Sequence, residues 1–543
     1  MKKTSLLLLL AFFSYSFLTA QQNISNNEKL ASLGKIYGYL KYYHPEVAKG
    51  ELDWDQELIK KIPEVLEAKD KTALSEVYIS WINNLGPIKP CRKCDTDESY
   101  FDKNFDLSWT QNTTFFTDEL ASKLKYIEKN RNQKNNSYVT TERVGKIKVT
   151  NEPAYQSFEF PDEEYRLLGL FKYWNIIEYF YPYKYLTDQH WDSVLREMIS
   201  KIKEVSSKDE YQSVIKVLIA KLDDSHAWIS FSGQRQKYLP VKISHIENKA
   251  VISGFYNDSI AKLNNLKLGD VILKINDLDV KTETEKNLKY VSGSNTNIKI
   301  KRTYSQILNG LEDKVNLTIE REGQTKQIKV NRYDFKDFNY WNKSKQLKSK
   351  SLNNQIGYIN MASVKSEDIK DIFESFENKT TIIIDLRNYP DFIYKYFTRF
   401  LNTEKRAFSK VYTPNINYPS RFIFKDNLKT LRNRKAFQGD IILLVNEETI
   451  SRAEFTAMAF QTADKVITLG NQTAGADGDV VVFEYMGGYK TAMSGNGILY
   501  PDGTETQRKG VKINIEIKPT INGLSDGRDE ILEKAIEIAN ERN

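Results

Sequence analysis

Ser451 is the residue of this chain best placed to act as a nucleophile. Ile441–Val445 are apolar and predict a buried strand, and a polar Asn-Glu-Glu-Thr turn follows. A helix then begins at Ser451, so its hydroxyl and the Arg452 amide lie at the positive end of the helix dipole. This arrangement suits acyl transfer. The alternative is structural, because Ser451-x-x-Glu454 is also a capping box.

His226 is the histidine best placed to act as a general base. It stands in LDDSHAWIS (222–230), where a predicted helix ends and a short strand begins. A base at such a junction can face a cleft, although a lone histidine is more often structural. The other three histidines lie in a helical repeat or in polar surroundings: His44, His190 and His245.

Cys91 and Cys94 are the only cysteines, in the sequence Cys-Arg-Lys-Cys. In an oxidising compartment we expect them to form a local disulfide. A thioredoxin-type redox pair is disfavoured because no βαβ pattern surrounds it, and zinc would need two further ligands. We therefore predict no metal and no cofactor.

The N-terminus predicts export. Lys2 and Lys3 precede the apolar run 6–13, and the small residue Ala20 precedes Gln21. Residues 1–20 thus resemble a secretory signal peptide, which is too short for a retained membrane span. No later segment is apolar enough to cross a bilayer, so we expect a soluble mature chain in a bacterial periplasm or outside the cell.

The composition indicates a multidomain protein without a nucleic-acid footprint. The 543 residues are enough for several cores. The formal net charge is +7, and removal of the two signal-peptide lysines lowers it by two, to +5. Because charges of both signs are interspersed, we predict solubility and no nucleic-acid partner.

A helical module occurs twice at an offset of 137 residues. The sequence 41–58 aligns without gaps with 178–195, and Trp54 and Asp55 match Trp191 and Asp192. Both copies have apolar residues at helical spacing, so we expect their aromatic residues in a core. Residues 87–155 between them are polar and predict an irregular linker with short strands.

Two further regions follow the repeat. Short strands are predicted from KAVISGF, DVILKINDLDV, NIKIKRT and KVNLTIERE, and LKLGDVILKINDLDV (266–280) resembles the signature of bacterial PDZ domains, which bind extended peptides. From about 352, strands and helices alternate, which predicts an α/β core. The expected organisation is a signal peptide at 1–20, helical regions at 21–155 and 156–237, a PDZ-like domain at 238–335 and a core at 336–543.

A family resemblance rests on several motifs in one order. They are LDDSH, the PDZ-like segment, IGYINM, DLRN, SRAEFTAMAF, LGNQTAG, YPDGTETQRKGV and GLSDGRDEILEKA. Together they resemble the serine peptidase family of C-terminal processing (tail-specific) proteases and tricorn core proteases, from about 165 to the end. The resemblance implies a multidomain α+β protein with a crotonase-like ββα peptidase core.

The resemblance also implies which base is used. Tail-specific members activate the serine with a lysine in a TxGK-type loop, but here Ala476 stands at the lysine position of the sequence TAGAD. Tricorn-type members use a Ser-His pair before the PDZ region, and Ser225-His226 matches it. The implied roles are Ser451 as nucleophile, His226 as general base and then acid, and Ser225 as its orienting partner.

The acid and the oxyanion hole depart from the family pattern. Gln507 stands at the position of the family glutamate, and Glu505 is the nearby ionisable alternative. Arg452 would supply one oxyanion N–H. The usual Gly-Gly of the second donor is replaced by Asn-Tyr-Pro-Asp, so Tyr389 or Asp391 is left as the alternative donor.

We predict from these residues an exported serine endopeptidase whose PDZ-like domain presents polypeptides. A second hypothesis is a weak or inactive protein of this fold that binds peptides or lipids at the cell envelope. A third is an interaction module that recruits partners through the helical repeat and the PDZ-like segment. Substrate identity and oligomeric state are not predicted.

Overall fold

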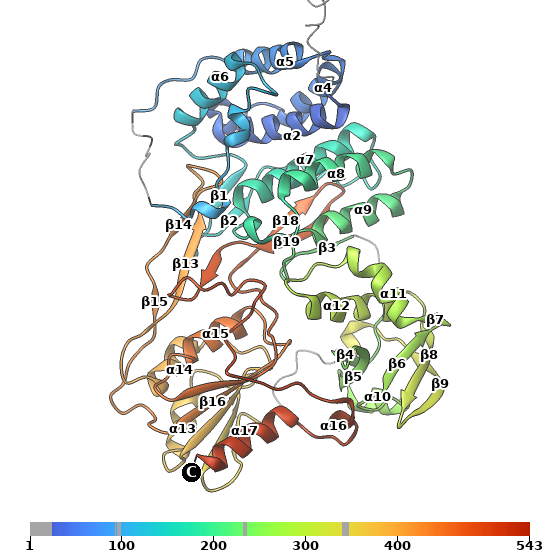
Figure 1. Ribbon diagram of the computed structural model, residues 1–543, viewed down its shortest axis with the longest axis vertical. Coiled ribbons are helices and arrows are strands. Elements are labelled where there is room, and N and C mark those ends of the chain that lie inside the picture. The colour runs from blue at the N-terminus through green and yellow to red at the C-terminus, as the bar shows by residue number, and fades with distance from the viewer. Residues whose placement is uncertain (1–23, 93, 95–98, 232–235, 339–346, 543) are drawn as a thin grey trace, which may run out of the picture.

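The computed structural model describes residues 24–92, 94, 99–231, 236–338 and 347–542. The predicted signal peptide lies outside these residues. Figure 1 shows helices at the top, a β-rich unit at the lower right and an α/β unit at the lower left. This is the multidomain α+β architecture that the sequence predicts. Among the described residues, no helix is both long and apolar enough to cross a membrane.

The two repeat copies fold into matching sets of helices. The first copy forms α2 (Asn26–Tyr43), α4 (Trp54–Glu67) and α5 (Lys71–Asn84), and the second forms α7 (Glu163–Phe180), α8 (Trp191–Glu204) and α9 (Lys208–Ala220). Each helix of the second copy begins 137 residues after its counterpart. Trp54 and Trp191 are buried, as expected, and each donates its indole N–H to a backbone carbonyl of the preceding long helix. The alignment of the sequence thus corresponds to equivalent structure.

Ion pairs connect the two copies reciprocally. Lys35 of α2 pairs with Asp192 of α8, and Lys172 of α7 pairs with Asp55 of α4 at 2.8 Å. The offset of 137 relates the two lysines and the two aspartates, so the same contact forms twice, as across a two-fold axis. The copies share one apolar core, which continues into strands of the C-terminal half.

The segment between the copies contains a helix that the sequence analysis missed. α6 (Asp118–Lys129) begins after Thr117, whose hydroxyl accepts a hydrogen bond from the Leu120 N–H at 3.4 Å. Leu120, Leu124 and Ile127 lie three or four positions apart and are buried. The expectation of an irregular linker is therefore wrong here. The expected short strands form as β1 (Val139–Thr141) and β2 (Ile147–Val149).

A disulfide joins Cys91 and Cys94, as predicted for an oxidising compartment. It lies beside the end of α6, where the Asn130 side chain accepts a hydrogen bond from the Cys91 N–H at 2.8 Å. The remaining short helices described before α8 are α3 (Pro45–Ala48), η1 (Asp102–Asn104), η2 (Ser108–Gln111) and η3 (Lys184–Leu186).

The PDZ-like region forms a sheet with the order β4-β5-β6-β8-β9, and β7 pairs with β6. The strands are β4 (Val241–Ile246), β5 (Lys249–Phe255), β6 (Val271–Ile275), β7 (Leu278–Asp279), β8 (Lys314–Arg321) and β9 (Gln324–Asn331). The helices are α10 (Asp258–Leu263), α11 (Val280–Asn287), η4 (Leu288–Tyr290) and α12 (Thr296–Leu308), and η5 (Phe335–Phe338) follows the sheet.

The predicted strand NIKIKRT is wrong, because its residues form the start of α12. Asn295 caps this helix and accepts a hydrogen bond from the Ile298 N–H at 3.1 Å. Residues 298–301 alternate in polarity like a strand, but the buried positions of α12 follow helical spacing over its whole length. The tertiary packing therefore overrides a short alternating pattern.

The C-terminal half is built on a sheet with the order β10-β11-β12-β16-β17-β21, parallel from β11 onward. Its strands are β10 (Ser349–Ser351), β11 (Ile356–Asn360), β12 (Thr381–Asp385), β16 (Asp440–Val445), β17 (Val466–Gly470) and β21 (Ile515–Glu516). Its helices are α13 (Asp368–Ser375), α14 (Tyr394–Leu401), α15 (Arg452–Phe460), α16 (Ile521–Ser525) and α17 (Glu530–Glu541). The predicted α/β core is confirmed.

Two smaller antiparallel sheets lie beneath the helical repeat (Figure 1). One contains β13 (Ala407–Pro414), β14 (Phe422–Phe424), β15 (Leu428–Lys429) and β20 (Gly497–Leu499); the other contains β18 (Val480–Tyr485), β19 (Tyr489–Ser494) and β3 (Trp228–Ser230). β3 begins two residues after His226 and pairs with β19. This pairing brings His226 to the end of β19.

Candidate active site

Ser451 lies at the strand-to-helix junction that the sequence predicts, directly before α15. Its φ is 55° and its ψ is −119°, a backbone conformation that is uncommon outside glycine. The capping serines Ser25 and Ser207 have the usual extended backbone, with φ of −63° and −143°. The Glu454 carboxylate accepts from the Ser451 N–H, as in a capping box, but the Ser451 side chain accepts no capping hydrogen bond among the described residues. A cap alone does not require positive φ, whereas a nucleophile on a sharp strand-to-helix turn does.

Glu454 holds a loop against the nucleophile. It is fully buried and accepts hydrogen bonds from the N–H groups of Ser451 (3.1 Å), Gly475 (2.8 Å) and Ala476 (3.0 Å) and from the Thr473 hydroxyl. The Ser451 N–H also lies 2.9 Å from the Ala476 carbonyl. Burial raises the pKa of the Glu454 carboxyl, and these donors oppose the rise.

The Ser225-His226 pair packs against the same loop. The Ser225 hydroxyl donates to the Ala474 carbonyl at 3.2 Å and accepts from the Ser294 N–H at 2.8 Å. The Ser225 N–H donates to the Ser294 hydroxyl at 2.7 Å. The 474–476 loop therefore joins the predicted nucleophile to the predicted Ser-His pair, which are far apart in the sequence.

A hydrogen-bond relay orients His226. Its Nδ1 lies 2.9 Å from the hydroxyl of Ser494, and that hydroxyl donates to Oδ1 of Asp224 at 3.0 Å. Because the hydroxyl gives its one proton to Asp224, it must accept from an Nδ1–H group. Nε2 then carries the lone pair of a general base, and it has no hydrogen-bond partner among the described residues.

The protonation state of His226 suits a base. The side chain is 8% exposed. Burial lowers the pKa of His226 below its usual value, and the nearby Asp224 charge partly opposes the decrease. The imidazole is therefore neutral at neutral pH, while Asp224 can stabilise an imidazolium during a reaction.

Asp224 and Ser494 are the site residues that sequence reasoning missed. Asp224 is fully buried and also accepts hydrogen bonds from the N–H groups of His226 (2.9 Å) and Ser494 (2.7 Å). A carboxylate two positions before the histidine was a visible signal in LDDSH. No local pattern marks Ser494, because only the pairing of β3 with β19 brings it to His226.

The two predicted acid-position residues have different surroundings. The buried Gln507 side-chain amide donates to Asp224 at 3.2 Å, so Gln507 belongs to the network around His226. Glu505 instead accepts hydrogen bonds from Tyr185 at 2.7 Å and Lys103 at 3.2 Å. The structure does not bring Glu505 to His226, because its side chain is directed toward η3. Asp224 is the carboxylate of the network.

The predicted oxyanion residues lie side by side. Arg452 is the first residue of α15, so its N–H has no acceptor within the helix. Its guanidinium lies 3.4 Å from the Pro390 carbonyl and 5.1 Å from the ring centroid of Tyr389. Tyr389 and Asp391 are thus on a loop in contact with Arg452. Which of their amides faces the oxyanion is still a prediction.

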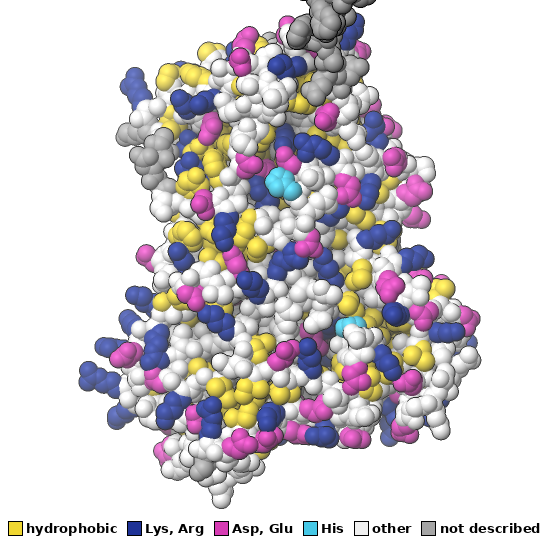
Figure 2. Space-filling model, viewed as in Figure 1, with side chains coloured by type: hydrophobic (Ala, Val, Ile, Leu, Met, Phe, Trp, Pro, Cys, Tyr) yellow, Lys and Arg dark blue, Asp and Glu magenta, His cyan; other side chains and the backbone are white. Residues whose placement is uncertain are grey.

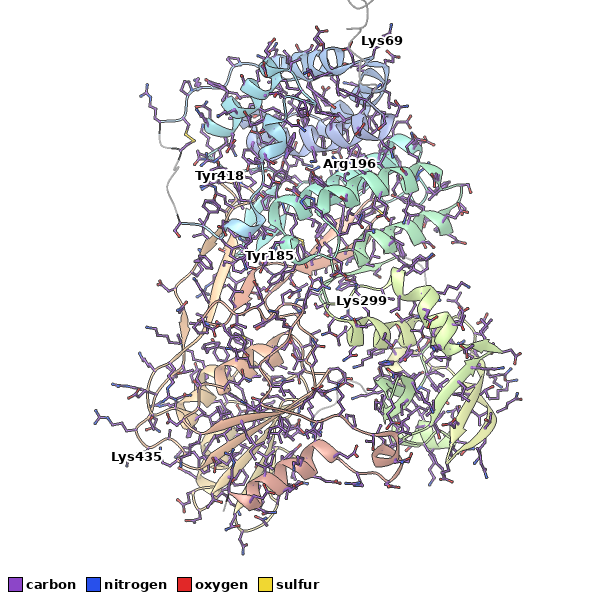
Figure 3. All side chains as sticks on the ribbon, in the orientation of Figure 1. Lys69, Tyr185, Arg196, Lys299, Tyr418 and Lys435 are labelled. Atoms are coloured by element: carbon purple, nitrogen blue, oxygen red, sulfur yellow. A yellow bond between two sulfur atoms is a disulfide. The ribbon has the colours of Figure 1, made fainter. Side chains whose placement is uncertain are left out.

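The PDZ-like helix α12 supports the site directly. Arg302 donates to the Ser225 carbonyl, at 2.5 Å, and Lys299 pairs with Asp223, which precedes Asp224 (Figure 3 labels Lys299). The cap residue Asn295 donates to the Ala474 carbonyl at 3.3 Å. The helix therefore contacts both the Ser-His segment and the loop beside the nucleophile.

The position predicted for a lysine base holds Ala476, and the next residue is an unusual acid. Asp477 is 2% exposed, and its Oδ2 has no hydrogen-bond partner among the described residues. Burial, followed by the charge of Glu454, raises the pKa of Asp477 well above its usual value. Such a carboxyl favours its protonated form more than an ordinary aspartate does, and it is no substitute for a lysine base.

Comparison with protein families identifies two domains. Residues 355–517 match peptidase family S41, and residues 235–332 match a PDZ domain. The chain contains an S41 peptidase domain. The S41 match extends from β11 to β21 and includes Ser451, and the PDZ match includes α12. No curated protein sequence matches the chain significantly.

Solved structures share this architecture at low sequence identity. Mature CPAF complexed with lactacystin is 15% identical, with 69% of this chain and 98% of that chain covered and a TM-score of 0.55. A mutant of CPAF is 14% identical, with 69% and 96% covered and a TM-score of 0.57. The photosystem II D1 C-terminal processing protease is 15% identical, with 67% and 99% covered and a TM-score of 0.42. The match to an S41 peptidase domain supports the assignment of the protein as a peptidase.

Proposed function

We propose that this protein is an exported serine endopeptidase that hydrolyses polypeptides through an acyl-enzyme on Ser451. The main support is the positive φ of Ser451 at a strand-to-helix turn, together with the contact of Ser225-His226 with the same 474–476 loop. The PDZ domain favours polypeptides as substrates. Export rests on the signal-peptide pattern of residues 1–20.

In the proposed reaction, Nε2 of His226 takes the proton of the Ser451 hydroxyl as the oxygen attacks the scissile carbonyl carbon. Asp224 stabilises the resulting imidazolium through Ser494, and the Arg452 N–H stabilises the oxyanion. The imidazolium then gives its proton to the leaving amine. A water molecule, activated by the same His226, releases the acyl group.

The contact between Ser451 and His226 has to tighten for this reaction. Their side chains share no hydrogen bond in the described structure, where Nε2 of His226 is unpartnered. Catalytic hydrogen bonds often form only in the substrate complex. We propose that a movement of the 474–476 loop brings Ser451 and His226 together, because this loop contacts both Ser451 and Ser225.

A second candidate function is a binding protein with this fold that takes peptides or lipids. Pro390 favours it, because proline cannot donate an N–H at the place where the family resemblance implies an oxyanion donor. The unpartnered His226 Nε2 agrees with either function.

An active-site-directed fluorophosphonate separates the two candidates. Purified mature protein is treated with the probe, and the adduct is mapped by mass spectrometry. The peptidase proposal expects labelling at Ser451 that is lost in His226→Ala and retained in the capping control Ser207→Ala. Absence of labelling in a folded protein would leave Ser451 as a helix cap and favour the binding function.

A further inference from the structure

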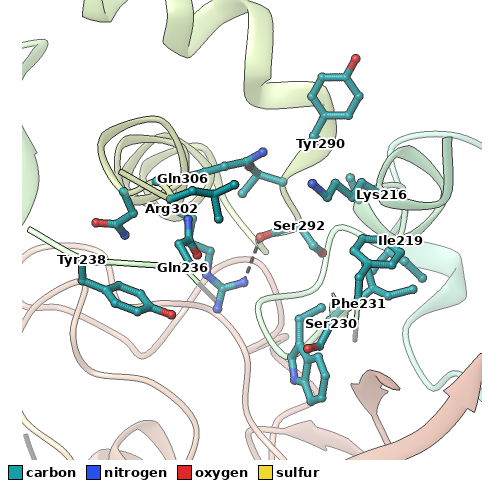
Figure 4. A pocket seen from close by; sticks show the side chains of 18 residues that line it. Lys216, Ile219, Ser230, Phe231, Gln236, Tyr238, Tyr290, Ser292, Arg302 and Gln306 are labelled. Carbon is teal, nitrogen blue, oxygen red and sulfur yellow. Dashed lines mark hydrogen bonds between the residues drawn. The ribbon is translucent and has the colours of Figure 1, made fainter. Parts of the chain in front are cut away.

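A cavity of about 730 Å³ lies directly beside His226. Its walls come from α9, from β3 with its flanking residues 227–231, and from α12 (Figure 4). Ala227, the residue after His226, is part of the lining. The cavity therefore adjoins the chain segment that carries the proposed general base, although the lining does not include His226 itself.

The charge of this cavity differs from that of the molecular surface. Positive and negative side chains are interspersed on the face shown in Figure 2. The cavity lining contains Lys216 and Arg302, and none of the described residues that line it is acidic. Figure 4 shows the two cations facing the cavity from opposite sides.

Neither cation has a carboxylate partner within the described residues. Arg302 is bound by two backbone carbonyls, those of Ser225 and Ser292, and its Ser292 contact is 2.9 Å. The Lys216 ammonium lies 5.7 Å from the ring centroid of Phe231. Burial lowers the pKa of both groups, so bringing an anion into the cavity would stabilise their charged forms.

One wall of the cavity is an unpaired strand edge. In the sheet order β18-β19-β3, β3 pairs with a strand on one side only among the described residues. Its Trp228 is 41% exposed, and further aromatic lining comes from Phe231, Tyr238 and Tyr290. A free strand edge binds an extended chain by adding a strand, and aromatic walls suit apolar side chains beside it.

We propose that this cavity is a specificity site that binds a carboxylate of the polypeptide substrate, with the chain extended along β3. The inference rests on the proposed peptidase function and specifies its substrate class. The carboxylate comes from an aspartate or glutamate side chain or from the C-terminus of the substrate. Lys216 and Arg302 bind it from opposite sides, and the apolar residues next to it contact the aromatic wall.

Binding to the Ser451→Ala protein tests the site without requiring hydrolysis. Fluorescent peptides of one apolar sequence carry glutamate or glutamine at each position in turn, with the C-terminus free or amidated, and affinity is measured by anisotropy. We expect one glutamate position or the free C-terminus to strengthen binding about tenfold. The peptide that binds more strongly identifies whether the carboxylate comes from a side chain or from the C-terminus. Equal binding of all peptides overturns the proposal.

Substitutions of Lys216 assign the effect to the cavity. Lys216→Gln is expected to remove most of the preference and Lys216→Arg to keep it, while Lys216→Glu should prefer a peptide with lysine at that position. Lys208→Gln is the matched control, because Lys208 is on the same helix but pairs with Glu159 outside the cavity. A preference unchanged in all Lys216 variants overturns the proposal.

Hydrolysis by the wild-type protein is measured separately on the same peptides. If carboxylate-dependent binding occurs without hydrolysis, the cavity proposal stands and the peptidase proposal fails. If peptides are cleaved with no carboxylate preference, the peptidase proposal stands and the cavity proposal fails. Arg302 is not used as the test residue, because it also holds the carbonyl of Ser225.

Discussion

Buried ionisable side chains have different partners in the helical repeat and around the peptidase site. In the repeat, the buried Lys35 and the half-buried Lys172 are each paired with an aspartate of the other copy. In the peptidase site, Arg302 is bound by backbone carbonyls and has no carboxylate partner, and Asp477 leaves one oxygen unpartnered, in both cases within the described part of the chain.

The difference indicates that ionisable side chains have a structural role in the repeat and an available charge at the site. Paired charges in the repeat fix how one copy docks on the other, and removing one carboxylate weakens the compensation of the lysine that it contacts. Near the site, ionisable side chains without an opposite charge reduce the stability of the fold. They remain available to bind a proton or a charged group of the substrate. The predictions below test this contrast, beginning with the largest expected effect on activity.

Ser451→Ala should lower kcat/KM for a cleaved peptide by roughly 10⁴-fold or more, because it removes the proposed nucleophile. The matched Ser25→Ala removes only a helix cap, which costs about 1 kcal/mol of stability. Steady-state kinetics with chemical denaturation distinguish the two serines. Equal activity in both variants would show that Ser451 is also only a cap.

Asp224→Asn should lower kcat by about 10²–10⁴-fold, because the imidazolium loses its buried negative partner. The pH profile supplies a second readout. Since burial lowers the pKa of His226, activity should fall only as the pH decreases below about 6.5. The Asp224 charge raises that pKa, so its removal should move the acid limb to still lower pH. An acid limb that moves to higher pH would contradict the relay.

Asp55→Asn should destabilise the protein while leaving the pH profile of the remaining activity unchanged. It removes one of the two carboxylates that pair with the half-buried Lys172, while Glu152 still pairs with it at 2.8 Å, so we expect a cost of about 1–3 kcal/mol. Asp192→Asn is the symmetry-related comparison and should cost more, because Lys35, whose side chain is 8% exposed, has no second carboxylate partner within the described residues. Urea denaturation measures both. Equal costs would mean that the pseudo-symmetric pairs are also energetically equivalent.

Glu505→Gln should change kcat/KM the least, by less than about threefold, because the substitution keeps the shape of a side chain that lies outside the His226 network. The carboxylate is bound by Tyr185 and Lys103 and not by the His226 network. Comparison with Gln507→Ala, which removes a donor to Asp224, sharpens the test. A larger loss of kcat/KM for Glu505→Gln than for Gln507→Ala would indicate that Glu505 is the acid of the site.

Much of the fold could be predicted from local patterns. The central parallel strands β12 and β16 are nearly continuous apolar runs, because a parallel strand covered on both faces needs no alternation. The repeat was visible because each copy keeps the same buried tryptophan and paired aspartate. α6 and the start of α12 were missed for one reason: a short or polar stretch does not reveal which of its faces becomes buried.

The sequence by itself determined the candidate nucleophile, the Ser-His pair, the PDZ domain and the family resemblance, because each depends on residues close together in the chain. Only the tertiary structure decided which carboxylate lies in the hydrogen-bond network of His226. Asp224 reaches the imidazole through Ser494, and Glu505 does not reach it, since the pairing of β3 with β19 is a long-range contact. The cavity beside His226 likewise exists only after α9, β3 and α12 have packed together.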